Sequence, residues 1–290
     1  MAKTKKINFD LFELSIKNND SLTVESLFKL SSDKYNPLVK ENGLITLGAP
    51  IKKSGSIYTG YLIHTQMYDI PPAFDIKKHK LSKLNLNDDQ GLAHTKSFLF
   101  DSEINVVLFE AGMHGVTFNS FCEFFETTSK VELESAIVID PSKMQKYKRL
   151  DLINTFEVSI ARVKNGTIFQ GEEAISDIIK LAEESNSKKI YYKLQSNRKD
   201  TLNVGLIRNL VNIFSRYKEN NEIKKLVVSG REGDEDKNTH IDLIVNRLKL
   251  EIETSLKRNM DLLLVNAKID QMTKAYNSIR SELLKVYKSE

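Results

Sequence analysis

The segment from Gly91 to Glu126, "GLAHTKSFLFDSEINVVLFEAGMHGVTFNSFCEFFE", is the most sharply patterned part of the 290-residue chain. Two apolar runs, "SFLF" and "VVLFEA", flank the turn-like residues "DSEIN" and predict a β-hairpin. The glycines of "GMHG" then predict a tight turn, because glycine adopts backbone conformations that other residues avoid. After Thr117, a plausible helix cap, apolar side chains recur at helical spacing. These side chains are Phe118, Phe121, Cys122 and Phe125.

The rest of the chain predicts an α+β protein with two domains, a strand-rich one over 1–150 and a basic one over 151–290. In the first, strands rich in β-branched and aromatic residues are expected at 7–14, 44–48, 56–67 and 131–139. Residues 70–90, with two prolines and no periodicity, are expected to form a surface loop. The sequence pattern of the second domain predicts the order β-α-β-α-β, followed by one long strand and a C-terminal helix. The corresponding ranges are 156–163, 171–185, 189–195, 201–218, 223–230, 240–254 and about 269–287.

The C-terminal helix carries an apolar seam whose members step by three and four residues, as in a coiled coil. This spacing leaves two interpretations open, packing into the chain's own core or contact with a second copy. The candidates for a dimer interface are Ile269, Met272, Tyr276, Ile279 and Leu283.

Cysteine usage and apolar runs indicate the compartment. The chain has 1 Cys, which excludes an internal disulfide framework and fits a reducing environment. Asp10 and Glu13 interrupt the segment where a signal peptide would need apolar residues. No apolar run approaches the roughly 20 residues of a membrane-spanning helix. We therefore expect a cytoplasmic protein, and no motif predicts a cofactor.

Charge is unevenly distributed, although the net charge is only +4. Residues 188–225 include ten basic and three acidic residues. Clustered cations favour nucleic-acid backbones, because neutralising phosphates releases counterions. No helix-turn-helix, zinc-finger or RNA-binding motif supports sequence-specific recognition. We predict one continuous patch over a strand, a loop and a helix, made of Lys188, Lys189, Tyr191, Lys193, Arg198, Lys199, Arg208, Asn212 and Arg216.

Two other patterns could carry chemistry. His94, His114 and Cys122 lack the spacing of a metal-binding pair, and Cys122 falls on the apolar helix face, where a thiol is inert. We interpret them as loop histidines and a core cysteine. The glycines of "SGREG" (229–233) lack the lysine and third glycine of phosphate-binding loops.

A metal-dependent nuclease remains an alternative. Such sites combine a carboxylate with a nearby lysine that orients water. Short matches occur at Glu222 with Lys224 and at Glu235 with Lys237, but no preceding aspartate is well placed. We therefore predict neither catalytic nor metal-binding residues.

Residues 91–125 resemble the middle of RexA-like phage-exclusion proteins, in which a strand precedes a second strand, a glycine turn and a helix. The segments "IDLIVNRLKLEIE" (241–253) and "IDQMTKAYNSIRSELLKVY" (269–287) are similar in order and position. This resemblance implies an α+β homodimer that binds double-stranded DNA without sequence preference in abortive infection. A membrane effector encoded nearby is an expected partner. The turn "GMHG" departs from the family pattern. A protein–protein adaptor is a further alternative.

Overall fold

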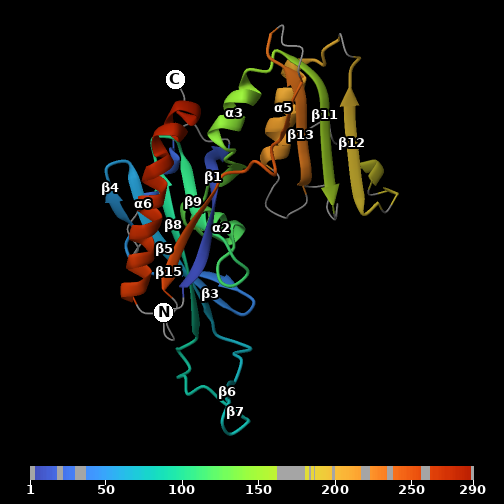
Figure 1. Cartoon of the computed structure of the whole chain (residues 1–290). Helices are drawn as coiled ribbons and strands as arrows, with labels where there is room; N and C mark the ends of the chain where they lie inside the picture. Colours follow the sequence, from blue (N-terminus) through green and yellow to red (C-terminus); the bar gives the residue numbers. More distant parts are fainter. Residues whose placement is uncertain are drawn as a thin grey trace. The chain divides into compact units, whose positions relative to one another are not determined.

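The computed structural model describes residues 4–17, 22–29, 37–161, 180–182, 184–185, 187–197, 200–216, 223–233, 238–255 and 262–288. It is an α+β protein, as predicted. The chain forms two compact units (Figure 1). The first contains Met1–Asp10, Leu14–Glu134 and Lys249–Ser281, and the second contains Leu11–Glu13, Ser135–Leu248 and Glu282–Glu290. This division differs from a single boundary near residue 150, because the last strand and most of the last helix return to the first unit.

The first unit is built on a nine-stranded sheet with the order β10-β1-β9-β8-β5-β3-β2, in which β15 also pairs with β1 and β4 with β5. Most of its strands follow the runs of β-branched and aromatic residues that predicted them. The strands are β1 (Thr4–Lys17), β2 (Leu38–Lys40), β3 (Gly43–Leu47), β4 (Lys52–Ser54), β5 (Ile57–Gln66), β8 (Leu92–Asp101), β9 (Val106–Glu110), β10 (Glu132–Ile137) and β15 (Lys249–Ser255).

The hairpin, turn and helix predicted over 91–126 are confirmed as β8, β9 and α2 (Phe118–Ser129). The Thr117 side chain caps α2 by accepting a hydrogen bond from the Ser120 amide at 3.1 Å. Because side chains alternate along a strand, β8 serves two layers. Phe98 packs against Phe121 of α2, while Asp101 contacts the C-terminal helix from the other face.

The C-terminal helix, α6 (Leu262–Tyr287), buries its apolar seam within the chain. Met272, Tyr276 and Leu283 are each 0% exposed. A side chain that is fully buried in one chain has no surface left for a second copy. The prediction of a dimer interface is therefore wrong for these three residues, while Ile269 and Ile279 are half-buried.

The second unit contains a four-stranded antiparallel sheet with the order β12-β11-β13-β14. Helix α5 (Val204–Arg216) covers one face, where Phe214 lies 6.1 Å from Phe156 between ring centroids. The helix predicted over 171–185 falls mostly outside the described residues. The strands are β11 (Leu152–Ala161), β12 (Lys189–Gln195), β13 (Ile223–Arg231) and β14 (Thr239–Asp242).

A helix that the sequence interpretation missed, α3 (Pro141–Lys148), replaces the basic connector expected there. Asp140 caps it through hydrogen bonds from the amides of Ser142 and Lys143, and Pro141 occupies the first turn. Both residues are favoured at a helix start, so the Asp-Pro pair was the available signal.

Two further segments differ from expectation. The long strand predicted over 240–254 is two strands, β14 and β15, because the Asp242 side chain accepts hydrogen bonds from the amides of Ile244 and Val245 and turns the chain. The expected loop over 70–90 contains a small exposed hairpin of β6 (Ala73–Asp75) and β7 (Lys80–Ser82). In the described part of the chain, no helix combines the length and apolar character needed to cross a membrane.

Candidate functional site

The predicted nucleic-acid patch lies on two opposite sides of the second unit rather than on one. Lys189, Tyr191 and Lys193 are exposed and alternate along β12 with Ile190, which is buried on the face that α5 covers. The solvent side of α5 therefore points away from these three residues. Lys188 is exposed just before β12, and Arg198 and Lys199 lie outside the described residues. The structure corrects the expectation of one continuous patch.

We call the side of this sheet that carries Lys189, Tyr191, Lys193 and Lys225 the sheet face. The carboxylate of Glu157 partly neutralises its charge. Glu157 on β11 accepts hydrogen bonds from Lys225 at 2.5 Å and pairs with Lys193 at 3.4 Å. The hydrogen bond from Lys225, with smaller contributions from Tyr191 and Lys193, lowers the pKa of Glu157 to about 2. Lysines engaged in this way offer little net charge to a phosphate.

The opposite side of this unit carries exposed cations on α5 and at the end of α3. Arg208, Asn212 and Arg216 follow each other at four-residue intervals along α5 and are all exposed. The Arg208 guanidinium donates a hydrogen bond to the Lys148 carbonyl at 3.1 Å, which places the basic end of α3 beside α5. We call this surface the helix face; its exposed cations are Lys146, Lys148, Arg149, Arg208 and Arg216.

Among the described residues, the carboxyl group of Glu13 lies near Lys148 and Arg216. Glu13 is half-buried, and its burial raises its pKa, while Lys148 and Arg216 lower it to a smaller extent. Cations outnumber this carboxyl group on the described part of the surface, which suits a polyanion that is recognised through its backbone. Sequence reasoning identified the α5 part of this face and missed the α3 part.

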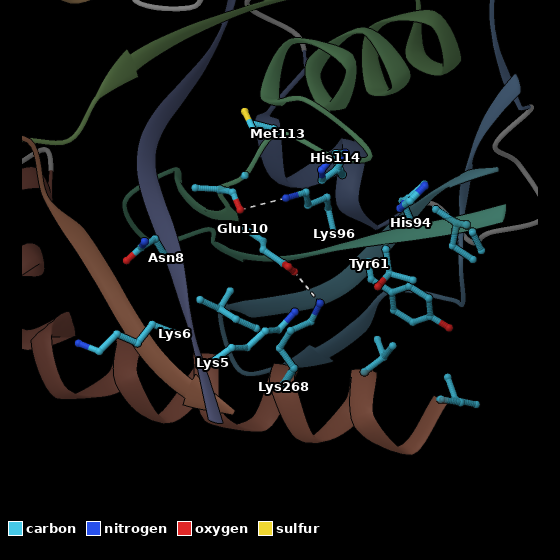
Figure 2. Close-up of a pocket in the computed structure, with 18 residues that line it drawn as sticks. Lys5, Lys6, Asn8, Tyr61, His94, Lys96, Glu110, Met113, His114 and Lys268 are labelled. Carbon is cyan, nitrogen blue, oxygen red and sulfur yellow. Dashed lines mark hydrogen bonds and ion pairs between the residues drawn. The ribbon is translucent and has the colours of Figure 1, made fainter. Parts of the chain in front are cut away.

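A second candidate site is a cavity of about 690 Å³ in the first unit (Figure 2). In the sheet order β9 lies between β1 and β8, but β9 ends at Glu110, opposite Ser97, whereas β8 starts at Leu92. The cavity occupies the notch that this short strand leaves between its neighbours. Residues of α6, among them Val265 and Lys268, complete its lining.

Charged groups are buried in this notch. Glu110 is 8% exposed and accepts hydrogen bonds from Lys268 at 2.6 Å and from the Ser97 amide at 3.0 Å. Lys96 is 5% exposed and donates to the Ala111 carbonyl at 2.9 Å. Burial lowers the pKa of Lys96, and the nearby ammonium groups of Lys268 and Lys5 lower it further against the opposing effect of Glu110.

The glycine turn shapes the same cavity. Gly112 has φ +135°, and a Cβ added there would lie 2.8 Å from the Lys96 ammonium nitrogen. Gly115 has φ +89° and would place a Cβ 3.1 Å from that of His94. The positive φ favours glycine at both positions, and at Gly115 a Cβ would also crowd that of His94.

His94 lies on β8 rather than in a loop, directly opposite His64 of β5, and the glycine turn places His114 beside it. The ring of His94 lies 6.2 Å from that of His114 and 6.5 Å from that of His64. Burial and the neighbouring His94 lower the pKa of His64. Cys122 is buried in α2. Among the described residues, no group of three side chains is placed to hold a metal ion.

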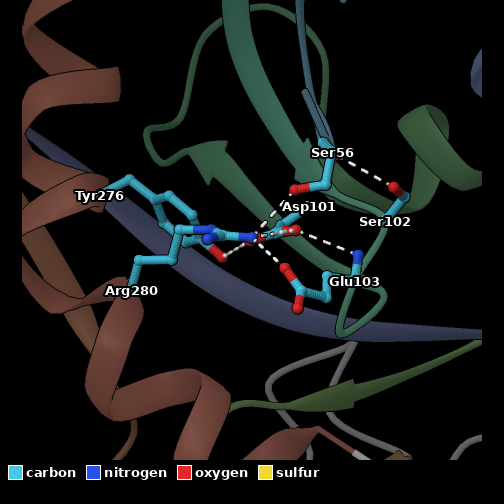
Figure 3. A network of polar contacts seen from close by, with 6 residues as sticks. All are labelled: Ser56, Asp101, Ser102, Glu103, Tyr276 and Arg280. Carbon is cyan, nitrogen blue, oxygen red and sulfur yellow. Dashed lines mark hydrogen bonds and ion pairs between the residues drawn. The ribbon is translucent and has the colours of Figure 1, made fainter. Parts of the chain in front are cut away.

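A polar cluster on the opposite face of β8 fastens α6 to the sheet (Figure 3). Asp101, which is 0% exposed, accepts hydrogen bonds from Tyr276 at 3.0 Å and from Arg280 Nε at 2.7 Å. Arg280 also contacts Glu103 at 2.6 Å. Burial raises the pKa of Tyr276, and the hydrogen bond to Asp101 raises that of Arg280. These groups satisfy one another, which makes the cluster structural.

The residues that suggested a nuclease are not assembled in the described structure. Lys224 is exposed near the start of β13, and Glu222, Glu235 and Lys237 lie outside the described residues. Of "SGREG", Gly233 has φ +55° and follows the end of β13, where its amide donates to Asp151. An amide that already binds a carboxylate is not available to cradle a phosphate.

The fold and its two cationic sites define an α+β protein with an exposed basic helix face and a buried lysine cavity. The description "Family of unknown function (DUF6731)" belongs to a family whose pattern matches residues 2–283, and the chain is a member of that family. None of the curated proteins matches the chain significantly.

Proposed function

We propose that this chain is a cytoplasmic, homodimeric protein that binds double-stranded DNA without sequence preference. The observation that supports the proposal is the helix face, which carries five exposed cations on α5 and at the end of α3. The two helices are in contact, because the Arg208 side chain donates a hydrogen bond to the Lys148 carbonyl. Such a surface neutralises several phosphates at once and reads no base edges. The resemblance to RexA-like proteins supplies the biological role, phage exclusion, and a nearby membrane effector as partner.

The helix face predicts a specific pattern of salt dependence. Each phosphate contact adds about 0.9 to the negative slope of log affinity against log salt. Neutralising Lys146, Arg149 and Arg208 together to Gln should therefore flatten the slope by roughly 2 to 3. The matched control neutralises Lys189, Lys193 and Lys225, which removes the same charge from the sheet face and should change the slope by less than about 1.

Fluorescence anisotropy with labelled duplexes of two unrelated sequences, at several salt concentrations, measures these slopes. Equal affinities for the two duplexes are expected. Wild-type binding by the helix-face variant, or a larger loss in the sheet-face variant, would show that the surface is assigned wrongly. Absence of duplex binding at low salt would refute the function itself. Sedimentation of the pure protein tests the homodimer separately.

A further inference from the structure

The notch between β1 and β8 contains more positive charge than its own carboxylate balances. Lys5, Lys96 and Lys268 converge there, and among the described residues of the lining Glu110 is the acidic one. Lys6 also contributes to the lining but extends outward in Figure 2 and pairs with Glu251 at 2.7 Å. Within the described lining, three lysines against one glutamate leave an excess of two positive charges; Lys96 and Lys268 are buried, and Lys5 is exposed.

Lys96 is a buried cation near Glu110 for which the described residues show no direct ion pair. Its ammonium group has three donors, and the contact found within the described residues is one neutral acceptor, the Ala111 carbonyl. In the same described part of the chain, the ion pair of Glu110 is with Lys268 and not with Lys96. A buried charge without a paired charge is costly, and proteins retain such groups where a ligand completes them.

Backbone donors face the same space. The Ser97 amide points toward the notch, since it donates to Glu110 there. Amides on one side of a strand recur every second residue, so the Thr95 amide points the same way, beyond the end of β9. An oxyanion beside Lys96 would therefore find ammonium and amide donors together, the combination that phosphate sites use.

We propose that this notch binds a phosphorylated small molecule of about the size of a mononucleotide. A phosphate monoester carries nearly two negative charges at neutral pH, which matches the excess, whereas a carboxylate would balance half of it. A cavity of about 690 Å³ is also within the range of ligand sites and much larger than a phosphate ion needs. Ile7, Ile63 and Val265 offer apolar walls for the rest of the ligand, and His94 and His114 lie in the lining beside the turn.

Gly112 and Lys96 both line this cavity. A Cβ at Gly112 would lie 2.8 Å from the Lys96 ammonium nitrogen, the flexible end of that side chain. The inference goes beyond DNA binding and concerns the other unit of the protein, so either proposal can fail without the other.

Calorimetric titration of the full chain with AMP, ribose 5-phosphate, pyrophosphate and inorganic phosphate tests the site, with adenosine as the control without phosphate. We expect AMP and ribose 5-phosphate to bind with dissociation constants below about 1 mM and adenosine not to bind. Lys96→Met should weaken binding about 10- to 100-fold, the effect of a charge-assisted hydrogen bond. The matched variant Lys78→Met, on the exposed hairpin of β6 and β7 and outside the lining, should bind within about twofold of wild type.

Several outcomes would overturn the proposal. These are no binding of any phosphate compound below about 1 mM, equal binding by Lys96→Met, or binding of adenosine as tight as that of AMP. Binding of a 5′-phosphorylated oligonucleotide without any of the small molecules would also refute a small-molecule site.

A second measurement uses the wild-type protein and does not depend on the variant folding. Acylation of lysines followed by mass spectrometry reports the accessibility of each ammonium group. AMP should protect Lys96 and leave Lys78, which is exposed and outside the lining, labelled as before. Equal labelling of Lys96 with and without AMP would contradict the site.

Discussion

The helix face and the lysine notch are both cationic, but their charges lie in opposite environments. On the helix face the cations are exposed, so each is solvated and contributes little to stability. In the notch Lys96 and Lys268 are 5% and 3% exposed, so each needs a partner. Lys268 has Glu110, whereas Lys96 has a carbonyl. Exposed cations therefore act through their combined charge, whereas a buried cation acts through the position in which the fold holds it.

The largest expected effect comes from removing a partner of a buried charge. Arg280→Met would leave Asp101, which is 0% exposed, without its cation and should lower the free energy of unfolding by about 3 to 5 kcal/mol. Denaturation by urea, followed by circular dichroism, measures this loss. Arg208→Met on the exposed helix face is the control, with an expected change within about 0.5 kcal/mol. Similar losses in both variants would break the distinction between buried and exposed charges.

Lys96→Met should have the opposite sign in the absence of ligand. Replacing a buried charge that lacks a charged partner by an apolar side chain of similar length should raise the free energy of unfolding by about 1 to 2 kcal/mol at pH 7. The same change should weaken ligand binding about 10- to 100-fold, the usual conflict between stability and function.

The pH dependence of this gain follows from the lowered pKa of Lys96. Below that pKa the folded protein carries the full cost of the buried ammonium group. As pH rises toward the ordinary value of 10.5, the folded protein releases the proton before the unfolded chain does, so the cost disappears. The gain in the free energy of unfolding from Lys96→Met should therefore shrink toward alkaline pH. A destabilised variant at every pH would contradict the proposed environment.

Glu157→Gln tests the neutralised sheet face. The pKa of Glu157 in the folded protein is lowered to about 2. The contribution of Glu157 to the free energy of unfolding is therefore fully present above the ordinary pKa of 4.5 and is lost as pH falls through 2. The variant should lose about 1 kcal/mol at pH 6 and approach wild-type stability near pH 2. Thermal or urea denaturation across this pH range measures the difference. A constant difference at all pH values would indicate packing rather than charge.

The smallest effect on stability is expected for Arg208→Gln. Its free energy of unfolding should stay within about 0.5 kcal/mol of wild type, while the salt dependence of DNA binding loses about 0.9 of its slope. Anisotropy and denaturation on the same sample compare the two quantities. An unchanged slope would remove Arg208 from the DNA-binding surface.

Local patterns in the sequence predicted much of the fold because their causes are local. Alternation and turn residues predicted β8, β9 and the glycine turn, and helical spacing with a Thr117 cap predicted α2. The same reasoning found α5 and the exposed row of Arg208, Asn212 and Arg216. It missed α3 because that helix has few apolar residues. The capping signal of Asp140 and Pro141 was therefore not enough to predict it.

The sequence by itself thus determined the α+β class, the patterned core and the basic character of the second half. Only the tertiary structure decided which charges act together. It placed Lys189 and Arg208 on opposite sides of one layer, since alternation along β12 and packing of α5 separate them. It also gathered Lys5, Lys96, Glu110 and Lys268 from four distant segments around the end of one short strand. Spacing along the chain encodes which side chains share a face of one element, but not which elements become neighbours.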